Sequence, residues 1–209
     1  MIETATGIIL RTRPLTETSL IVNWLTPALG RISTVAKGAR RPKSPFAGKL
    51  DLFYEADFSF ARSRRSELHT LREVGLRATH PTLRKELGYL QQASYCAALI
   101  EQSTERETPL PEIYRMLVGL LAHLPAQPPQ PRTIYAFELK LLHELGQFPD
   151  LDQTKLSAPT QTLVESLLKN SWKELAALKP TAAQVKGLRQ FLSGYLIFHL
   201  GRIPKGRPT

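Results

Sequence analysis

The sequence predicts an α+β protein of two domains: a small antiparallel β-barrel or sandwich over residues 1–80 and an all-α domain over residues 81–209. Two observations predict this division. The first 80 residues hold short runs of β-branched, aromatic and other apolar residues, separated by turn residues. After His80-Pro81 the apolar residues recur at the spacing of a helix. A chain of 209 residues is long enough to bury a core in each part.

Five strands are expected in the first part. The clearest alternation lies in F-Y-E-A-D-F-S-F, where one strand face carries Tyr54, Ala56, Phe58 and Phe60. T-P-A-L-G at residues 26–30 is typical of a turn, and S-R-R-S at residues 63–66 is typical of a hairpin tip. The expected strands are residues 7–11, 19–25, 31–37, 53–60 and 67–74.

The second part shows four long helical stripes and one shorter helix near residues 163–168. The first stripe is Leu83, Leu87, Leu90, Ser94, Ala97 and Glu101, and the other three run over residues 113–124, 134–145 and 185–200. P-A-Q-P-P-Q-P at residues 125–131 predicts a stiff linker. Gly146, with Pro149 just beyond, predicts the end of the third helix.

The charge of the chain is concentrated in two places. The net charge is +10, of which residues 1–80 supply +6, residues 81–200 supply +1 and residues 201–209 supply +3. Such a field favours a polyanionic partner, with nucleic acid first among them. The candidate contact residues are Lys37, Arg40, Arg41 and Lys43, then Arg11, Arg13, Arg31, Arg62, Arg64 and Arg65, with Arg202, Lys205 and Arg207 as a further DNA or partner contact.

The stretch V-A-K-G-A-R-R-P-K-S at residues 35–44 has the densest positive charge. A charge run by itself is usually a solvated face, but here it follows a predicted strand, with further basic loops in the same module. If those loops converge on one groove, their cations can pair with phosphates. Gly38 and Pro42 would shape the loop. Candidates for base stacking are Trp24, Phe46, Phe53 and Tyr54, although such residues more often belong to a core.

The sequence predicts no catalytic site. The single cysteine, Cys96, excludes an internal disulfide and a multi-cysteine metal site, and a reducing cytoplasm is the simple inference. H-E-L-G-Q at residues 143–147 lacks the second His of a zinc-protease helix, and Gly48-Lys49 lacks the rest of a phosphate-binding loop. Neither a signal peptide nor a membrane-spanning segment is expected.

Several segments together resemble the RecO family of bacterial recombination and DNA-repair mediators. The most specific is L-T-P-A-L-G-R-I-S-T-V-A-K-G-A-R-R-P-K-S at residues 25–44. G-I-I-L-R-T-R is similar to the first strand of the family, and residues 135–152 resemble the helix that leads into its zinc-binding segment. Residues 191–207 resemble its closing helix and basic tail.

The resemblance implies an N-terminal OB-fold barrel followed by a helical domain, and a DNA-binding role without catalysis. It implies binding of single- and double-stranded DNA, annealing of complementary strands, and partnership with RecR and with the acidic tail of single-strand-binding protein. Through these the recombinase RecA would be loaded onto DNA. A bacterial cytoplasmic, nucleoid-associated location follows, with no membrane partner.

The chain departs from the family where many relatives carry two C-x-x-C pairs. Here Asp152 is followed by Q-T-K-L-S-A-P-T, which supplies no zinc ligand of the usual kind. We therefore expect no zinc and no other cofactor. Three alternatives stay open: an OB-fold RNA-binding protein, an adaptor that receives acidic protein tails, and an unrecognised hydrolase.

Overall fold

The computed structural model describes residues 1–207, which form two compact units. The first unit contains residues 1–81 together with residues 104–116. The second contains residues 82–103 and the described chain from residue 117 onward. The predicted domains, residues 1–80 and 81–209, stay a prediction about folding units, but residues 104–116 lie with the barrel although they follow it in sequence.

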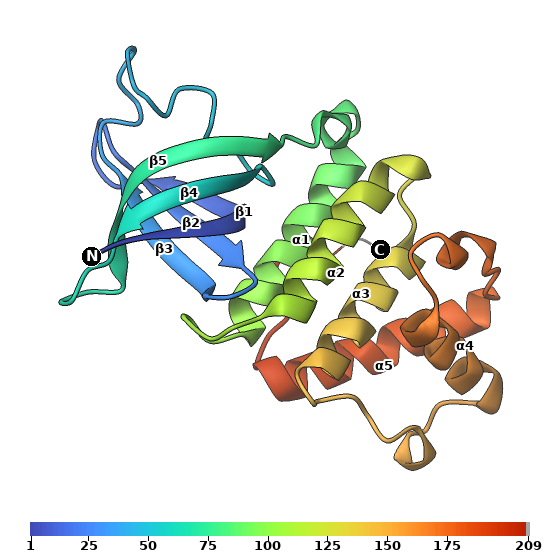
Figure 1. The fold of residues 1–209 in the computed structure, drawn as a ribbon. Helices are drawn as coiled ribbons and strands as arrows, with labels where there is room; N and C mark the ends of the chain where they lie inside the picture. Colours follow the sequence, from blue (N-terminus) through green and yellow to red (C-terminus); the bar gives the residue numbers. More distant parts are fainter. Residues whose placement is uncertain (208–209) are drawn as a thin grey trace. The chain divides into compact units, whose positions relative to one another are not determined.

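Five strands of the first unit form a closed barrel in the order β1-β2-β3-β5-β4 (Figure 1). β3 and β5 pair in parallel and the other neighbours are antiparallel. This five-stranded closed topology is the OB-fold, as expected. The strands are β1 (Ile2–Pro14), β2 (Leu20–Thr26), β3 (Gly30–Ala36), β4 (Glu55–Ala61) and β5 (Leu68–Ala78).

The first strand closes the barrel because it pairs with two neighbours in succession. Its first half, from Ile2 to Ile8, pairs with β4, and its second half, from Ile8 to Pro14, pairs with β2. The register shifts between Ile9 and Arg11, where a bulge can bend a strand. The strand is therefore longer than the predicted residues 7–11, because pairing on both sides extends it past the apolar run.

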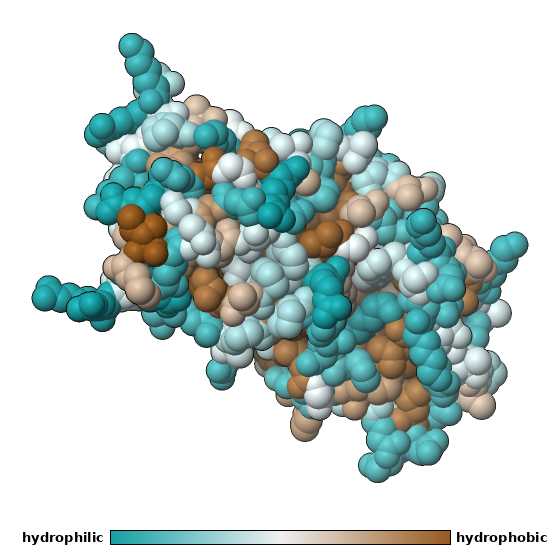
Figure 2. Space-filling model, viewed as in Figure 1, coloured by the Kyte–Doolittle hydropathy of each residue, from teal (hydrophilic) through white to brown (hydrophobic). Residues whose placement is uncertain are grey.

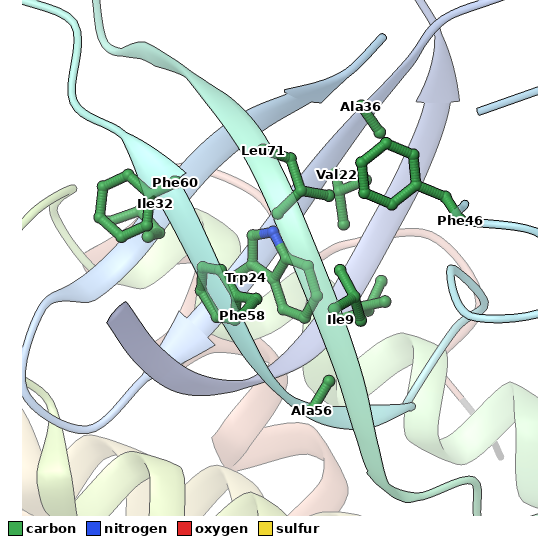
Figure 3. Packing of buried hydrophobic residues seen from close by; sticks show 11 residues of the cluster. Ile9, Val22, Trp24, Ile32, Ala36, Phe46, Ala56, Phe58, Phe60 and Leu71 are labelled. Carbon is green, nitrogen blue, oxygen red and sulfur yellow. The ribbon is translucent and has the colours of Figure 1, made fainter. Parts of the chain in front are cut away.

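The barrel core forms around Trp24, which is fully buried and stacks on Phe58 with ring centroids 4.0 Å apart (Figure 3). The predicted alternation of β4 is confirmed for Ala56, Phe58 and Phe60, which all point into this core. The indole N–H of Trp24 donates to the hydroxyl of Thr34 at 2.9 Å, and Thr34 is itself buried. The one polar atom of the largest core side chain is thus satisfied.

A loop of the chain beyond α1 is fixed to the barrel at the β2–β3 turn. Gly30 has a φ of +64°, and a β-carbon at this position would lie 1.7 Å from the carbonyl oxygen of Thr108. The backbone N–H of Glu107 donates to the carbonyl of Arg31 at 3.0 Å, and that of Leu110 donates to Pro27 at 3.1 Å. Because only glycine leaves this space, Gly30 allows residues 104–110 to pack on the barrel.

The helices of residues 82–207 agree with the five that the periodicity predicts. They are α1 (Leu87–Ser103), α2 (Pro111–His123), α3 (Pro131–Glu144), α4 (Ala158–Lys169) and α5 (Ala182–Leu200), with short 3-10 helices at Pro81–Lys85, Leu124–Ala126, Leu151–Gln153 and Glu174–Ala177. The second unit packs around α3, which contacts α1, α4 and α5 (Figure 1). The first half of α2 is grouped with the barrel.

The ends of the helices follow from local sequence. Gly146 has a φ of +67° just beyond Leu145, the C-cap of α3, so the predicted stop is confirmed. Thr181 and Gln184 form a capping box at the start of α5, and Gly201, with a φ of +73°, ends that helix. α5 buries Leu188, Leu192 and Leu196, as its stripe predicts.

The predicted stripe of the first helix is wrong for Leu87 and Ser94, although Ala97 is buried as it predicts. Leu87 is 68% exposed and Ser94 is also exposed, whereas Ala93, Cys96 and Leu99 are buried. Leu83 is buried but belongs to the 3-10 helix before α1. The helix carries apolar residues on more than one side, so periodicity alone did not select the face that packs.

Replacing Thr34 with Val tests the buried indole contact. Because Val has nearly the shape of Thr but no acceptor, the Trp24 N–H would be left unpaired in the core. We expect the free energy of unfolding to fall by about 1–3 kcal/mol in urea denaturation. Thr34→Ser keeps the hydroxyl and is the control; a loss as large as that of Thr34→Val would show that packing, and not the hydrogen bond, is responsible.

Candidate nucleic-acid interface

The loop after β3 is anchored in the barrel while its cations face solvent. Phe46 is 6% exposed and belongs to the core cluster, where Figure 3 shows its ring beside Val22 and Ala36. Gly38 has a φ of +70°, so the predicted shaping role of this glycine has a backbone basis. Pro42 is the second residue of a turn in which the backbone N–H of Ser44 donates to the carbonyl of Arg41 at 3.1 Å, a position that suits the fixed φ of proline. Lys37, Arg40, Arg41 and Lys43 are all exposed.

The loop between β1 and β2 lies beside this basic loop. Strand pairing places Pro14 opposite Leu20, and Leu20 opposite Ala36, so the end of β1, the start of β2 and the end of β3 are neighbours. The backbone N–H of Arg40 donates to the carbonyl of Thr18 at 3.0 Å. Arg13, one residue before Pro14, is exposed. The structure therefore brings Arg13 to the same end of the barrel as the basic loop.

The structure adds Arg72, which sequence reasoning missed. Val35 pairs with Thr70 in the parallel β3–β5 ladder. Two residues further along each chain come Lys37 and Arg72, and both are exposed. Parallel pairing of strands so far apart in sequence has no local signal, so the sequence could not have placed Arg72 here. The basic end of the barrel is defined as Arg13, Lys37, Arg40, Arg41, Lys43 and Arg72.

Hydrophilic side chains project from this part of the barrel in Figure 2, where Figure 1 shows the loop that follows β3. Arg11 is exposed on β1 opposite Asn23, further from the end of the strand. It borders the basic end without belonging to the loops that form it.

The arginines of the β4–β5 hairpin lie elsewhere. Ser33, in the middle of β3, pairs with Leu68 at the start of β5. Because the two strands run in parallel, the hairpin that precedes Leu68 lies toward the start of β3, whereas the basic loop follows its end. Arg64 and Arg65 are exposed at that hairpin. The basic loops thus occupy two ends of the barrel, so the condition that they all converge on one groove is not met.

Two further candidates are engaged inside the barrel unit. Arg31 donates from Nε to the hydroxyl of Thr104 at 2.7 Å. Arg62 donates to Glu3 at 2.7 Å and to Glu107 at 2.5 Å. These contacts with Glu3 and Glu107 raise the pKa of Arg62, and the hydrogen bond from Arg62 lowers the pKa of the Glu3 carboxyl. Both arginines hold residues 104–107 to the barrel, which argues against a phosphate contact.

Of the basic residues after α5, one is paired inside the second unit and two are exposed. Arg207 donates to both carboxylate oxygens of Glu138, at 2.7 and 2.5 Å, and its side chain is only 12% exposed. Glu138 is fully buried on α3 and also accepts from the hydroxyl of Tyr95 at 2.6 Å. Arg207 is therefore part of the core of the second unit. Arg202 and Lys205 are exposed.

The proposed stacking aromatics are mostly core residues. Trp24, Phe46 and Phe53 are buried, and Tyr54 is half-buried. Trp24 and Phe53 are fully covered, so neither can stack on a base. The expectation that these residues are more often core than platform is confirmed for three of the four.

The segment after Asp152 is held without a metal-ligand set. Within residues 1–207, no three His, Cys, Asp or Glu side chains gather so that they could hold a metal ion. The carbonyl of Leu151 accepts from Thr154 at 2.7 Å and from Gln161 at 2.8 Å, which ties the segment to α4. Cys96 is buried, and burial raises the pKa of its thiol. The absence of zinc stays a prediction.

Over the same residues, no helix has the length and hydropathy needed to cross a membrane.

These features place the chain among proteins that join an OB-fold barrel, here with a cationic loop at one end, to a set of helices. The family model "Recombination protein O N terminal" matches residues 1–80, and "Recombination protein O C terminal" matches residues 84–154. The chain belongs to the RecO family, as the resemblance implied. α4 and α5 lie outside both matched ranges.

Curated relatives named DNA repair protein RecO are similar over the same region. The protein of Anaeromyxobacter dehalogenans (strain 2CP-C) is 33% identical over 147 residues, which is 70% of this chain and 58% of the relative. That of Rhodopirellula baltica is 34% identical over 143 residues, 68% of this chain and 53% of the relative. That of Bacillus pumilus is 31% identical over 147 residues, which is 70% of this chain and 57% of the relative. The matched part spans somewhat over half of each relative.

Replacing Phe46 with Ala tests whether the core anchors the basic loop. Removing a buried phenyl ring should lower the free energy of unfolding of the barrel by about 3 kcal/mol. Hydrogen exchange of the amides of residues 37–50 should accelerate more than that of β4, because the loop loses its attachment. Phe46→Leu keeps most of the apolar contact and is the control. Equal acceleration in β4 would contradict a local anchoring role.

Proposed function

We propose that this chain is a DNA-repair and recombination mediator that binds single- and double-stranded DNA and anneals complementary strands. In this proposal it works by binding, without catalysing a covalent step. With RecR, it would help to load RecA onto DNA covered by single-strand-binding protein, whose acidic tail would be a partner. It would act in the bacterial cytoplasm at the nucleoid, without cofactor or membrane.

The single observation that carries the DNA-binding part is the basic end of the barrel. Six exposed cations come from three places in the sequence: the end of β1, the loop after β3 and the middle of β5. Cations gathered in this way can neutralise several phosphates at once and release counterions. Membership of the RecO family supports DNA as the polyanion.

The same surface supports annealing in physical terms. Two complementary strands repel each other through their phosphates, and a cationic surface bound to one strand lowers that repulsion for the second. Phosphate contacts carry no sequence information, so base pairing between the strands is left to decide which strands join. The loop anchored by Phe46 presents Lys37, Arg40, Arg41 and Lys43 from a fixed base.

The triple variant Lys37→Ala/Arg40→Ala/Arg41→Ala tests the site. We expect weaker binding of single-stranded DNA and slower annealing, because three phosphate contacts are lost. The plot of log affinity against log salt should become shallower by roughly two units. Fluorescence anisotropy with a labelled oligonucleotide over a salt series measures both quantities.

The matched control is Arg64→Ala/Arg65→Ala, which removes two exposed arginines from the other end of the barrel. We expect the control to keep the wild-type salt slope. If the salt slope is unchanged in the triple variant, or is reduced equally in the control, the basic end of the barrel is not the site of phosphate contact. Equal affinity for matched RNA, together with no annealing activity, would contradict the proposed function.

A further inference from the structure

α5 carries large apolar side chains on its solvent side. Phe198 is 84% exposed and Ile197 is 51% exposed. Helices of globular proteins usually turn such residues toward a core, and α5 does so with Leu188, Leu192 and Leu196. The phenyl ring of Phe198 is thus not among the side chains that pack α5 against the core. An exposed apolar patch on a soluble domain commonly marks a contact with a ligand or a partner.

The exposed ring belongs to a series of aromatic side chains. The ring of Phe191 lies 5.4 Å from that of Tyr195, Tyr195 lies 4.4 Å from His199, and His199 lies 5.1 Å from Phe198. The hydroxyl of Tyr195 donates to the carbonyl of Gln147 at 3.1 Å, which fixes the middle of the series. The α5 aromatic face is defined as Phe191, Tyr195, Phe198 and His199.

The chain around this face is cationic. Residues 175–207 contain no Asp or Glu and six Lys and Arg, of which one, Arg207, is paired with the buried Glu138. Lys186, Arg202 and Lys205 are exposed, before and after the aromatic residues. A hollow of about 360 Å³ beside Phe191 is lined by Lys155. Charge complementarity therefore favours an anionic occupant that also has apolar, flat groups.

We infer that the α5 aromatic face is a second nucleic-acid contact, which stacks on the unpaired bases of single-stranded DNA. This inference rests on the proposed function and adds a surface outside the regions that the family models match. Aromatic rings beside cations are the combination that single-strand binders use, because every base has a face for stacking. A duplex hides those faces, so this surface selects single strands.

The geometry favours a base over an apolar peptide. The ring of Phe198 projects into solvent, where a flat base can lie against it. An apolar side chain of a peptide instead needs a pocket that receives it and excludes water. Phe191 and Phe198 are two helical turns apart on the same side of α5, about 10 Å along the axis. They can therefore contact different nucleotides of one strand.

The test compares Phe198→Ala, Phe198→Trp and the control Leu87→Ala, which removes a side chain 68% exposed on α1 of the same unit. Anisotropy is measured with an oligo-dT strand and with a duplex of equal length, each over a salt series. We expect Phe198→Ala to weaken single-strand binding about fivefold or more. Duplex binding and the salt slope should stay unchanged, because an uncharged ring is removed. Phe198→Trp and Leu87→Ala should bind like the wild type.

Three outcomes would overturn the inference. Phe198→Ala could leave single-strand binding unchanged, or weaken duplex binding equally. It could also lose binding to a labelled acidic peptide that carries one phenylalanine while keeping its binding to oligo-dT.

The triple variant of the basic end separates the two proposals. If it weakens all DNA binding and Phe198→Ala does not, only the second contact is wrong. If only Phe198→Ala weakens binding, the basic end is wrong and the stacking surface stands.

Discussion

Closure of the barrel through β1 is the constraint on which the first unit depends. β1 pairs with β4 along its first half and with β2 along its second, with the register shift between Ile9 and Arg11. This pairing surrounds Trp24 and Phe58 with strands and satisfies the backbone groups that an open edge would leave exposed. It also decides where each loop emerges, and thereby which cations share a surface.

The placement of charge follows from this topology and from ion pairing inside each unit. Arg13, the loop at residues 37–43 and Arg72 meet at one end because β1, β2, β3 and β5 are neighbours there. Arg62 and Arg207 have the same charge, but each is bound to buried or half-buried carboxylates. A cation that neutralises Glu3 or Glu138 is not available to a phosphate. Net charge therefore overstates the surface that can meet DNA.

The two proposed surfaces would contact DNA in two physically different ways. The basic end of the barrel would act through charge, so its contribution would fall as salt rises. The α5 aromatic face would act through stacking, which depends little on salt and requires unpaired bases. A protein that meets both single strands and duplexes would use the first for either and the second for single strands alone.

Local sequence was sufficient to predict the approximate positions of the five strands and five helices, the stop at Gly146 and the exposed basic loop at residues 37–43. These follow from periodicity, from turn residues and from dense local charge. Tertiary contacts were needed to show that Leu87 faces solvent while Leu99 is buried, that Arg72 lies beside Lys37, and that Arg31, Arg62 and Arg207 make internal contacts. Each of these depends on partners more than 30 residues away in sequence or on which helix face finds a neighbour, and neither is encoded in local spacing.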